Sequence, residues 1–203
     1  MSVIGITGGI ATGKTAFSQQ LRELLPDAAF FDADIAAREL THHDVEVRAL
    51  IEQEFGAAIY SEAGHLNRPE LRAIVFADPG KKVALEQILH PRIRRQWAIE
   101  AESRRTSPGP FFADIPLLYE TGGETLCQRV VVVACSARVQ LERLMTRSSL
   151  DRSAAEQMIA AQMPLTEKIT RADHVVWNNG TRAALAQQVE TLAALWRHRA
   201  VRE

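Results

Sequence analysis

The sequence predicts an α/β protein in which a five-stranded parallel sheet is covered by helices on both faces. Two observations favour this class: short, mostly apolar runs that are typical of strands buried on both faces, and helical segments that alternate with them. The runs expected to form the strands are residues 3–6, 29–32, 111–114, 129–135 and 174–177. Alternation of this kind indicates three layers, with the sheet in the middle.

A glycine-rich loop follows the first run and carries the most specific local signal in the chain. Residues 8–15 read Gly-Gly-Ile-Ala-Thr-Gly-Lys-Thr, and helical periodicity continues from them over residues 15–25. Two glycines at this spacing, followed by Lys and Thr and placed between a strand and a helix, are typical of loops that hold the phosphates of a nucleoside triphosphate. A plain turn would need neither the Lys-Thr pair nor the spacing. The sequence therefore predicts the three-layer fold of the P-loop NTPases.

Each residue type in this loop has a physical role toward phosphate. The glycines let successive backbone N–H groups turn toward the anion, and the following helix adds the positive end of its dipole. Lys14 supplies a mobile ammonium group for the β and γ phosphates, and the Thr15 hydroxyl suits a Mg²⁺ ion carried with the nucleotide. The residues expected to contact the nucleotide here are Gly8, Gly9, Ala11, Thr12, Gly13, Lys14, Thr15 and Ala16.

The composition indicates an ordinary globular protein. The chain has 203 residues, 46% of them hydrophobic, and a formal net charge of -1, so no bulk charge attracts it to nucleic acid or to a membrane surface. Two cysteines do not make a disulfide framework, no apolar stretch approaches the roughly 20 residues of a membrane span, and the N-terminus lacks the features of a secretory signal. We expect a cytoplasmic protein without nucleic-acid or membrane partners. The sequence does not reveal the oligomeric state, and a monomer is favoured.

The spacing of the strands predicts two domains. The nucleotide-binding core comprises residues 1–34 and 107–203, and a helical insertion at residues 35–106 is too long for a simple crossover, so we expect it to bind the acceptor substrate. A second helical segment, approximately residues 137–171, is rich in arginine near its start and is expected to form a lid. Thr181 is the predicted N-cap of a closing amphipathic helix at residues 182–198.

Asp32 and Asp34 come at the end of the second predicted strand, where both carboxylates could reach the mouth of the phosphate site. On a strand, residues two apart share a face, so geometry alone leaves both open. A structural alternative is that Asp34 only caps a helix beginning at residue 35. Asp114 ends an apolar strand, where it either holds Mg²⁺ through water or is an ordinary turn residue.

Three basic residues are further candidates. Arg143 and Arg147 are four residues apart, so they share a face if their helix persists, with Arg143 expected to act in catalysis and Arg147 to contact phosphate or nucleotide. The alternative is a solvated basic face. Arg38 is a similar candidate on the helix after Asp34. His90 precedes a proline, which predicts an extended residue at a helix boundary.

Taken together, these segments resemble the dephospho-coenzyme A kinase family along nearly the whole chain. The resemblance rests on the phosphate loop, on Asp-Ala-Asp at 32–34, on Leu-His-Pro at 89–91, on Pro-Leu-Leu at 116–118, on the segments 140–147 and 160–163, and on Asn-Asn-Gly at 178–180. It implies transfer of the γ-phosphoryl group of ATP to the 3′-hydroxyl of dephospho-coenzyme A. It favours Asp34 as the base, puts Asp32, Arg38, His90 and Leu117 near the acceptor, and sets Asn179 and Gly180 beside the adenine.

Two residues depart from the family pattern, and rival functions lack support. Ala11 stands where a glycine is common, and Trp177 stands where an aspartate commonly precedes the Asn-Asn-Gly turn. Another small-molecule or nucleotide kinase would share the loop but should lack the ordered set of motifs. A GTP-binding switch would need an Asn-Lys-x-Asp element, and the chain has no Asn-Lys pair. Lys14, Thr15 and Asp34 together argue against a catalytically idle nucleotide-binding module.

Overall fold

A computed structural model describes residues 2–104, 106 and 109–200, and the chain divides into two compact units. The first unit comprises Met1–Phe31 and Glu100–Glu203, and the second comprises Asp32–Ile99. The sheet belongs to the first unit and the second is helical. The acceptor-binding role expected for residues 35–106 stays a prediction.

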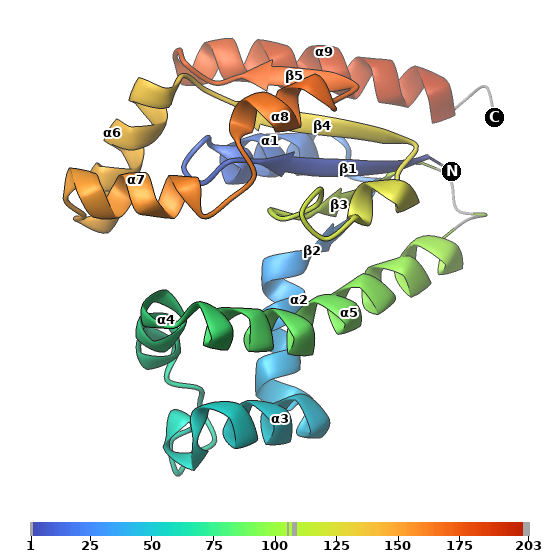
Figure 1. Cartoon of the computed structure of the whole chain (residues 1–203). Coiled ribbons are helices and arrows are strands. Elements are labelled where there is room, and N and C mark those ends of the chain that lie inside the picture. The colour runs from blue at the N-terminus through green and yellow to red at the C-terminus, as the bar shows by residue number, and fades with distance from the viewer. Residues whose placement is uncertain (1, 105, 107–108, 201–203) are drawn as a thin grey trace. The chain divides into compact units, whose positions relative to one another are not determined.

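The sheet has five parallel strands in the order β2-β3-β1-β4-β5 (Figure 1). The strands are β1 (Val3–Gly8), β2 (Ala29–Asp32), β3 (Phe111–Asp114), β4 (Arg129–Ala134) and β5 (His174–Trp177). The predicted fold class is therefore confirmed, although β1 runs two residues further than expected and β4 ends one residue earlier. Because the carboxyl ends of parallel strands share one edge, the loop after β1 and the residue that ends β3 are neighbours there.

One face of the sheet packs on α1 (Lys14–Leu24) and α9 (Arg182–Ala200), which lie side by side (Figure 1). Alternate strand residues supply this core, as their period of two requires: Ile4, Ile6, Phe112, Val131, Val133 and Val176. At Gly5 on β1, the Leu118 side chain packs so closely against the strand that a Cβ there would lie 2.6 Å from Leu118 Cδ2. Thr181 accepts a hydrogen bond from the Ala184 N–H at 3.2 Å, so it caps α9 as predicted.

The segment between β4 and β5 folds into α6 (Ala137–Ser148), α7 (Arg152–Ala160) and α8 (Leu165–Thr170), and the short helix η2 (Gly123–Leu126) precedes β4. The Ser136 and Asp151 side chains cap α6 and α7 by accepting from the N–H groups of Val139 and Ala154. Within the ranges described, no helix is both long and apolar enough to cross a membrane.

The second unit contains α2 (Ala33–His43), α3 (Val45–Phe55), η1 (Ala57–Ile59), α4 (Arg68–Ala77) and α5 (Pro79–Ser103), the last continuing into the first unit. Its own small core is built from Leu40, Val47, Ile51, Ile59, Tyr60 and Leu71. The Asp44 and Asn67 side chains cap α3 and α4. A separate core of this kind explains why the helical insertion forms a unit by itself.

The helix boundary predicted at His90 is wrong, because α5 continues through Pro91. A proline inside a helix removes one backbone hydrogen bond and costs about 3 kcal/mol. Arg92 offsets part of this cost by donating to the Ile88 carbonyl at 2.9 Å and by an ion pair with Glu46 at 2.9 Å. The apolar side chains of α5 also pack on the core of the second unit, which favours the continuous helix: Leu85, Ile88, Leu89 and Ile93.

Candidate active site

The loop between β1 and α1 turns at two residues that have a left-handed backbone conformation. Gly13, just before α1, has φ 97°, in the left-handed region that favours glycine, and a Cβ there would lie only 2.1 Å from Asn178 Nδ2. Ala11 also has positive φ, at 60°. The departure at Ala11 therefore falls on a position where glycine is easier, at a cost of about 1 kcal/mol.

The N-terminus of α1 presents free backbone donors at this loop. The first intrahelical hydrogen bond runs from the Phe17 N–H to the Gly13 carbonyl at 3.1 Å, so the N–H groups of Lys14, Thr15 and Ala16 have no acceptor within the helix. No side chain of the described residues caps this end. Unpaired N–H groups at the positive end of a helix dipole fit the phosphate groups of a nucleotide.

Lys14 and Asp114 form a buried ion pair beside the loop. Lys14 Nζ donates to Asp114 Oδ1, and the Ser18 hydroxyl donates to Asp114 Oδ2 at 2.6 Å. The two ion-paired side chains are only 15% and 4% exposed. Asp114 is therefore not a solvated turn residue: the end of β3 holds its carboxylate against the loop lysine.

The segment after β4 contacts the loop through several polar side chains. Arg143 Nη1 donates to the Thr12 carbonyl at 3.4 Å, so the structure brings this predicted residue to the loop. Arg147, one turn further along α6, is exposed. Burial raises the pKa of the neighbouring Cys135 thiol, and the Arg143 guanidinium partly opposes this rise.

The Asn-Asn-Gly turn meets the loop through a residue that sequence reasoning did not single out. Asn178 is 8% exposed, and its Nδ2 donates to the Thr12 carbonyl at 2.9 Å. The predicted residue Asn179 accepts from the Ser136 N–H at 2.7 Å, and Gly180 is exposed. Leu117, expected near the acceptor, is half-buried and lies in the first unit.

The two candidate carboxylates of the second unit do not share a strand face. Asp32 ends β2 and is the N-cap of α2, where its Oδ1 accepts from the N–H groups of Asp34 and Ile35 at 2.9 and 3.0 Å. Asp34 lies in the first helical turn and is exposed. The helix therefore begins two residues earlier than expected, and the capping role considered for Asp34 belongs to Asp32.

Arg38 and His90, two further acceptor-side candidates, also lie in the second unit. Arg38 is exposed on α2. His90 is half-buried inside α5, and burial lowers the pKa of its imidazole, with a smaller opposite effect from Glu86. A lowered pKa keeps His90 neutral at physiological pH, so it suits hydrogen bonding better than charge pairing.

A fully buried lysine supports the start of the phosphate loop. Lys168 is 0% exposed, forms an ion pair with Glu120 at 2.8 Å, and donates to the carbonyls of Pro116 at 3.0 Å and Gly8 at 3.4 Å. Glu120 Oε1 also accepts from the Met163 N–H. No local pattern marks Lys168, because its helix is short and its partners are remote in sequence.

We expect Lys168→Met to lower the free energy of unfolding by about 2 kcal/mol, because it takes the cation from the Glu120 carboxylate and one donor from each of two carbonyls. Glu120 is 21% exposed, so water compensates part of the loss. Urea unfolding measures the change. Lys82→Met is the matched control, since the Lys82 side chain is 44% exposed and its contact with Glu86 is 3.9 Å long. Equal stability of the two variants would contradict the supporting role of Lys168.

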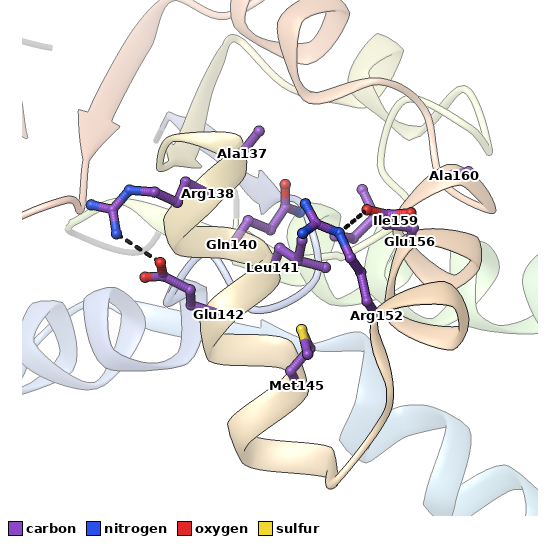
Figure 2. A pocket seen from close by; sticks show the side chains of 10 residues that line it. All are labelled: Ala137, Arg138, Gln140, Leu141, Glu142, Met145, Arg152, Glu156, Ile159 and Ala160. Carbon is purple, nitrogen blue, oxygen red and sulfur yellow. Dashed lines mark hydrogen bonds and ion pairs between the residues drawn. The ribbon is translucent and has the colours of Figure 1, made fainter.

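A pocket of about 550 Å³ lies between α6 and α7 (Figure 2). Gln140 is one of its lining residues, and the ion pairs Arg138–Glu142 and Arg152–Glu156 lie along it. Gln140 Nε2 donates to the Ile10 carbonyl at 2.9 Å, so the pocket borders the phosphate loop through this side chain.

Comparison with known proteins identifies the family. The sequence profile of dephospho-CoA kinase matches residues 2–184. A dephospho-CoA kinase of Bacillus cereus is 40% identical over 195 residues, which cover 96% of each chain. One from Anaeromyxobacter dehalogenans is 44% identical, covering 96% of this chain and 92% of its own. The chain belongs to the dephospho-CoA kinase family.

A solved member of the dephospho-CoA kinase family has the same architecture. The structure of the Campylobacter jejuni enzyme superposes with a TM-score of 0.66 at 25% identity and covers 96% of both chains. The family assignment makes the chain a kinase, as the resemblance implied. The segments that carried the resemblance also hold side chains now seen at the loop, namely Gln140, Arg143 and Asn178.

Proposed function

We propose that this protein transfers the γ-phosphoryl group of ATP to the 3′-hydroxyl of the ribose of dephospho-coenzyme A, giving coenzyme A. The observation that carries the proposal is the family match over residues 2–184, which includes the complete phosphate loop. Dephospho-coenzyme A is then the small-molecule partner. We further propose that the protein acts in the cytoplasm as a monomer.

The residues of the first unit suit the donor side of this reaction. Phosphoryl transfer passes through a loose transition state, so the protein mainly aligns the donor and acceptor and neutralises charge. The N–H groups at the start of α1 and the Lys14 ammonium would bind the phosphates, with Lys14 exchanging its Asp114 partner for a phosphate oxygen. Arg143, already beside the Thr12 carbonyl, would stabilise charge on the transferring group. Arg147, Asn179 and Gly180 remain proposed nucleotide contacts.

Thr15 and Asp114 would hold Mg²⁺ with the nucleotide. A hydroxyl and a carboxylate are hard oxygen ligands, and Mg²⁺ in kinases commonly takes one or two protein ligands and completes its shell with phosphate and water. The position of the Asp114 carboxylate fits this role, because it lies beside the loop in contact with Lys14 and Ser18. The ion supplies neutralisation of phosphate charge when it is bound.

On the acceptor side, Asp34 would orient the ribose hydroxyl and accept its proton late in the reaction, when bond formation has made the hydroxyl acidic. The exposure of Asp34 in the first turn of α2 supports this choice over Asp32, which is half-buried. Arg38, His90 and Leu117 remain proposed acceptor contacts.

The direct test is to incubate the protein with ATP, Mg²⁺ and dephospho-coenzyme A and to follow both small molecules by mass spectrometry. We expect an acceptor heavier by one phosphoryl group, together with ADP. Adenosine and shikimate serve as control acceptors. Phosphorylation of a control acceptor but not of dephospho-coenzyme A would replace the proposal with another small-molecule kinase.

We expect Arg143→Ala to lower kcat more than it raises the KM for dephospho-coenzyme A. An arginine directed at developing charge contributes mainly in the transition state, and its removal therefore appears in kcat. Steady-state kinetics with each substrate varied in turn give both parameters, with Arg138→Ala on the exposed face of α6 as the control. A raised KM with unchanged kcat would make Arg143 a binding residue only.

A further inference from the structure

The carbonyl groups of two peptide units in the phosphate loop are held by side chains from outside the loop motif. Gln140 on α6 donates to the Ile10 carbonyl at 2.9 Å, and Asn178 after β5 donates to the Thr12 carbonyl at 2.9 Å. Both donors are largely buried, at 4% and 8% exposed. Neither contact follows from the loop sequence, because the donors lie more than a hundred residues away along the chain.

Holding a carbonyl also fixes the direction of an N–H group. In a trans peptide the C=O of one residue and the N–H of the next point in opposite directions within one plane, and the described chain has no cis peptide bond. The Ile10 carbonyl shares its peptide with the Ala11 N–H, and the Thr12 carbonyl shares its peptide with the Gly13 N–H. A donor on each carbonyl therefore turns the Ala11 and Gly13 N–H groups away from α6 and Asn178.

The Ala11 peptide needs such support, because alanine disfavours the left-handed conformation that glycine adopts readily. Ala11 has φ 60° and Gly13 has φ 97°, so each N–H belongs to a residue in the left-handed region. Rotation of either peptide would put a carbonyl oxygen where an N–H had been. A carbonyl oxygen repels a phosphate, whereas an N–H attracts it.

The peptide units before and after the Ile10 Cα are both held by side chains. The Ile10 N–H donates to Gln162 Oε1 at 2.8 Å, just as its carbonyl accepts from Gln140. Thr12 has a second, weaker partner, because Arg143 also donates to its carbonyl at 3.4 Å. The loop is therefore oriented by residues of the segment between β4 and α9.

We propose that Gln140 and Asn178 are positioning residues, which orient the N–H groups of Ala11 and Gly13 toward the nucleotide phosphates. The proposal rests on the proposed function in so far as the loop binds ATP, but it does not depend on the acceptor. Neither residue touches a reacting atom. Their removal should weaken binding of the phosphate chain itself.

The test measures binding of ATP and of inorganic tripolyphosphate by calorimetry in Gln140→Met and Asn178→Leu, two apolar changes of similar size. Gln140→Met removes the side-chain donor to the Ile10 carbonyl, and Asn178→Leu leaves the Thr12 carbonyl with only the longer contact from Arg143. We therefore expect affinity for both ligands to fall about tenfold. Gln157→Met on the exposed face of α7 is the matched control and should bind like the unaltered protein. Thermal unfolding of each variant shows whether it is folded at the temperature at which the affinities are compared.

A kinetic readout separates orientation of the loop from general loosening of the fold. We expect the KM for ATP to rise about tenfold in both variants, while the KM for dephospho-coenzyme A stays within about twofold. Tripolyphosphate affinity equal to that of the control, in folded Gln140→Met and Asn178→Leu, would overturn the proposal. If instead the unaltered protein binds tripolyphosphate but does not phosphorylate dephospho-coenzyme A, only the proposed acceptor is refuted.

Discussion

Lys14→Ala is expected to lower kcat at least about a hundredfold. The ammonium group is the mobile cation of the phosphate loop, and its charge matters most when negative charge spreads over the transferring phosphoryl group. In the structure it is paired with Asp114 and only 15% exposed, so it is held at the loop before nucleotide arrives. Steady-state kinetics with saturating ATP and acceptor measure the loss.

Lys14→Arg is the control for charge in this experiment. It keeps the positive charge but replaces a compact ammonium with a planar fork, so we expect activity between that of the unaltered protein and Lys14→Ala. Thermal unfolding should accompany both variants, because removing Lys14 leaves the Asp114 carboxylate with only Ser18 among the contacts described above. Activity of a folded Lys14→Ala variant within about tenfold of the unaltered protein would contradict the assigned role.

Asp34→Asn is also expected to lower kcat at least about a hundredfold, because an amide cannot accept the proton of the ribose hydroxyl and aligns it less well. The change preserves size, and Asp34 is not the residue that caps α2, so the helix should persist. Two rates are measured for each variant: the hydrolysis of ATP in the absence of acceptor, and the transfer of the γ-phosphoryl group to dephospho-coenzyme A. Only the transfer should fall by this factor.

Asp32→Asn is the matched comparison two residues away. Asparagine is as good an N-cap as aspartate, so this variant keeps the hydrogen bonds to Asp34 and Ile35 and removes only the charge. We expect a clearly smaller loss of kcat than in Asp34→Asn. Near-normal turnover of Asp34→Asn with a large loss in Asp32→Asn would transfer the base role to Asp32.

The strands and the phosphate loop could be predicted because their signals are local. Apolar runs of strand length and the glycine, lysine and threonine spacing depend on neighbours in sequence, and the five strands match within two residues. The start of α2 was harder to predict from the sequence, because Asp32 and Asp34 are both good cap residues. Only the structure shows which one accepts the helix N–H groups.

Features that depend on distant partners could not be predicted. The rule that the residue before proline leaves the helix fails at His90, because packing of α5 and the contacts of Arg92 outweigh the cost of Pro91. Likewise, Gln140, Asn178 and Lys168 meet the loop from elements remote in sequence. A glutamine, an asparagine and a lysine have no spacing rule that predicts such contacts.

Both backbone polar groups of Ile10 are hydrogen-bonded to glutamines of the helical hairpin α6–α7, Gln140 near the start of α6 and Gln162 just after the end of α7. The base of this hairpin is thus attached to the phosphate loop at two points. Rotation of the entire hairpin would break both hydrogen bonds, whereas bending at its far end, around residues 148–151, would leave them intact. Any closure over bound nucleotide should therefore be a movement of the tip about a stationary base.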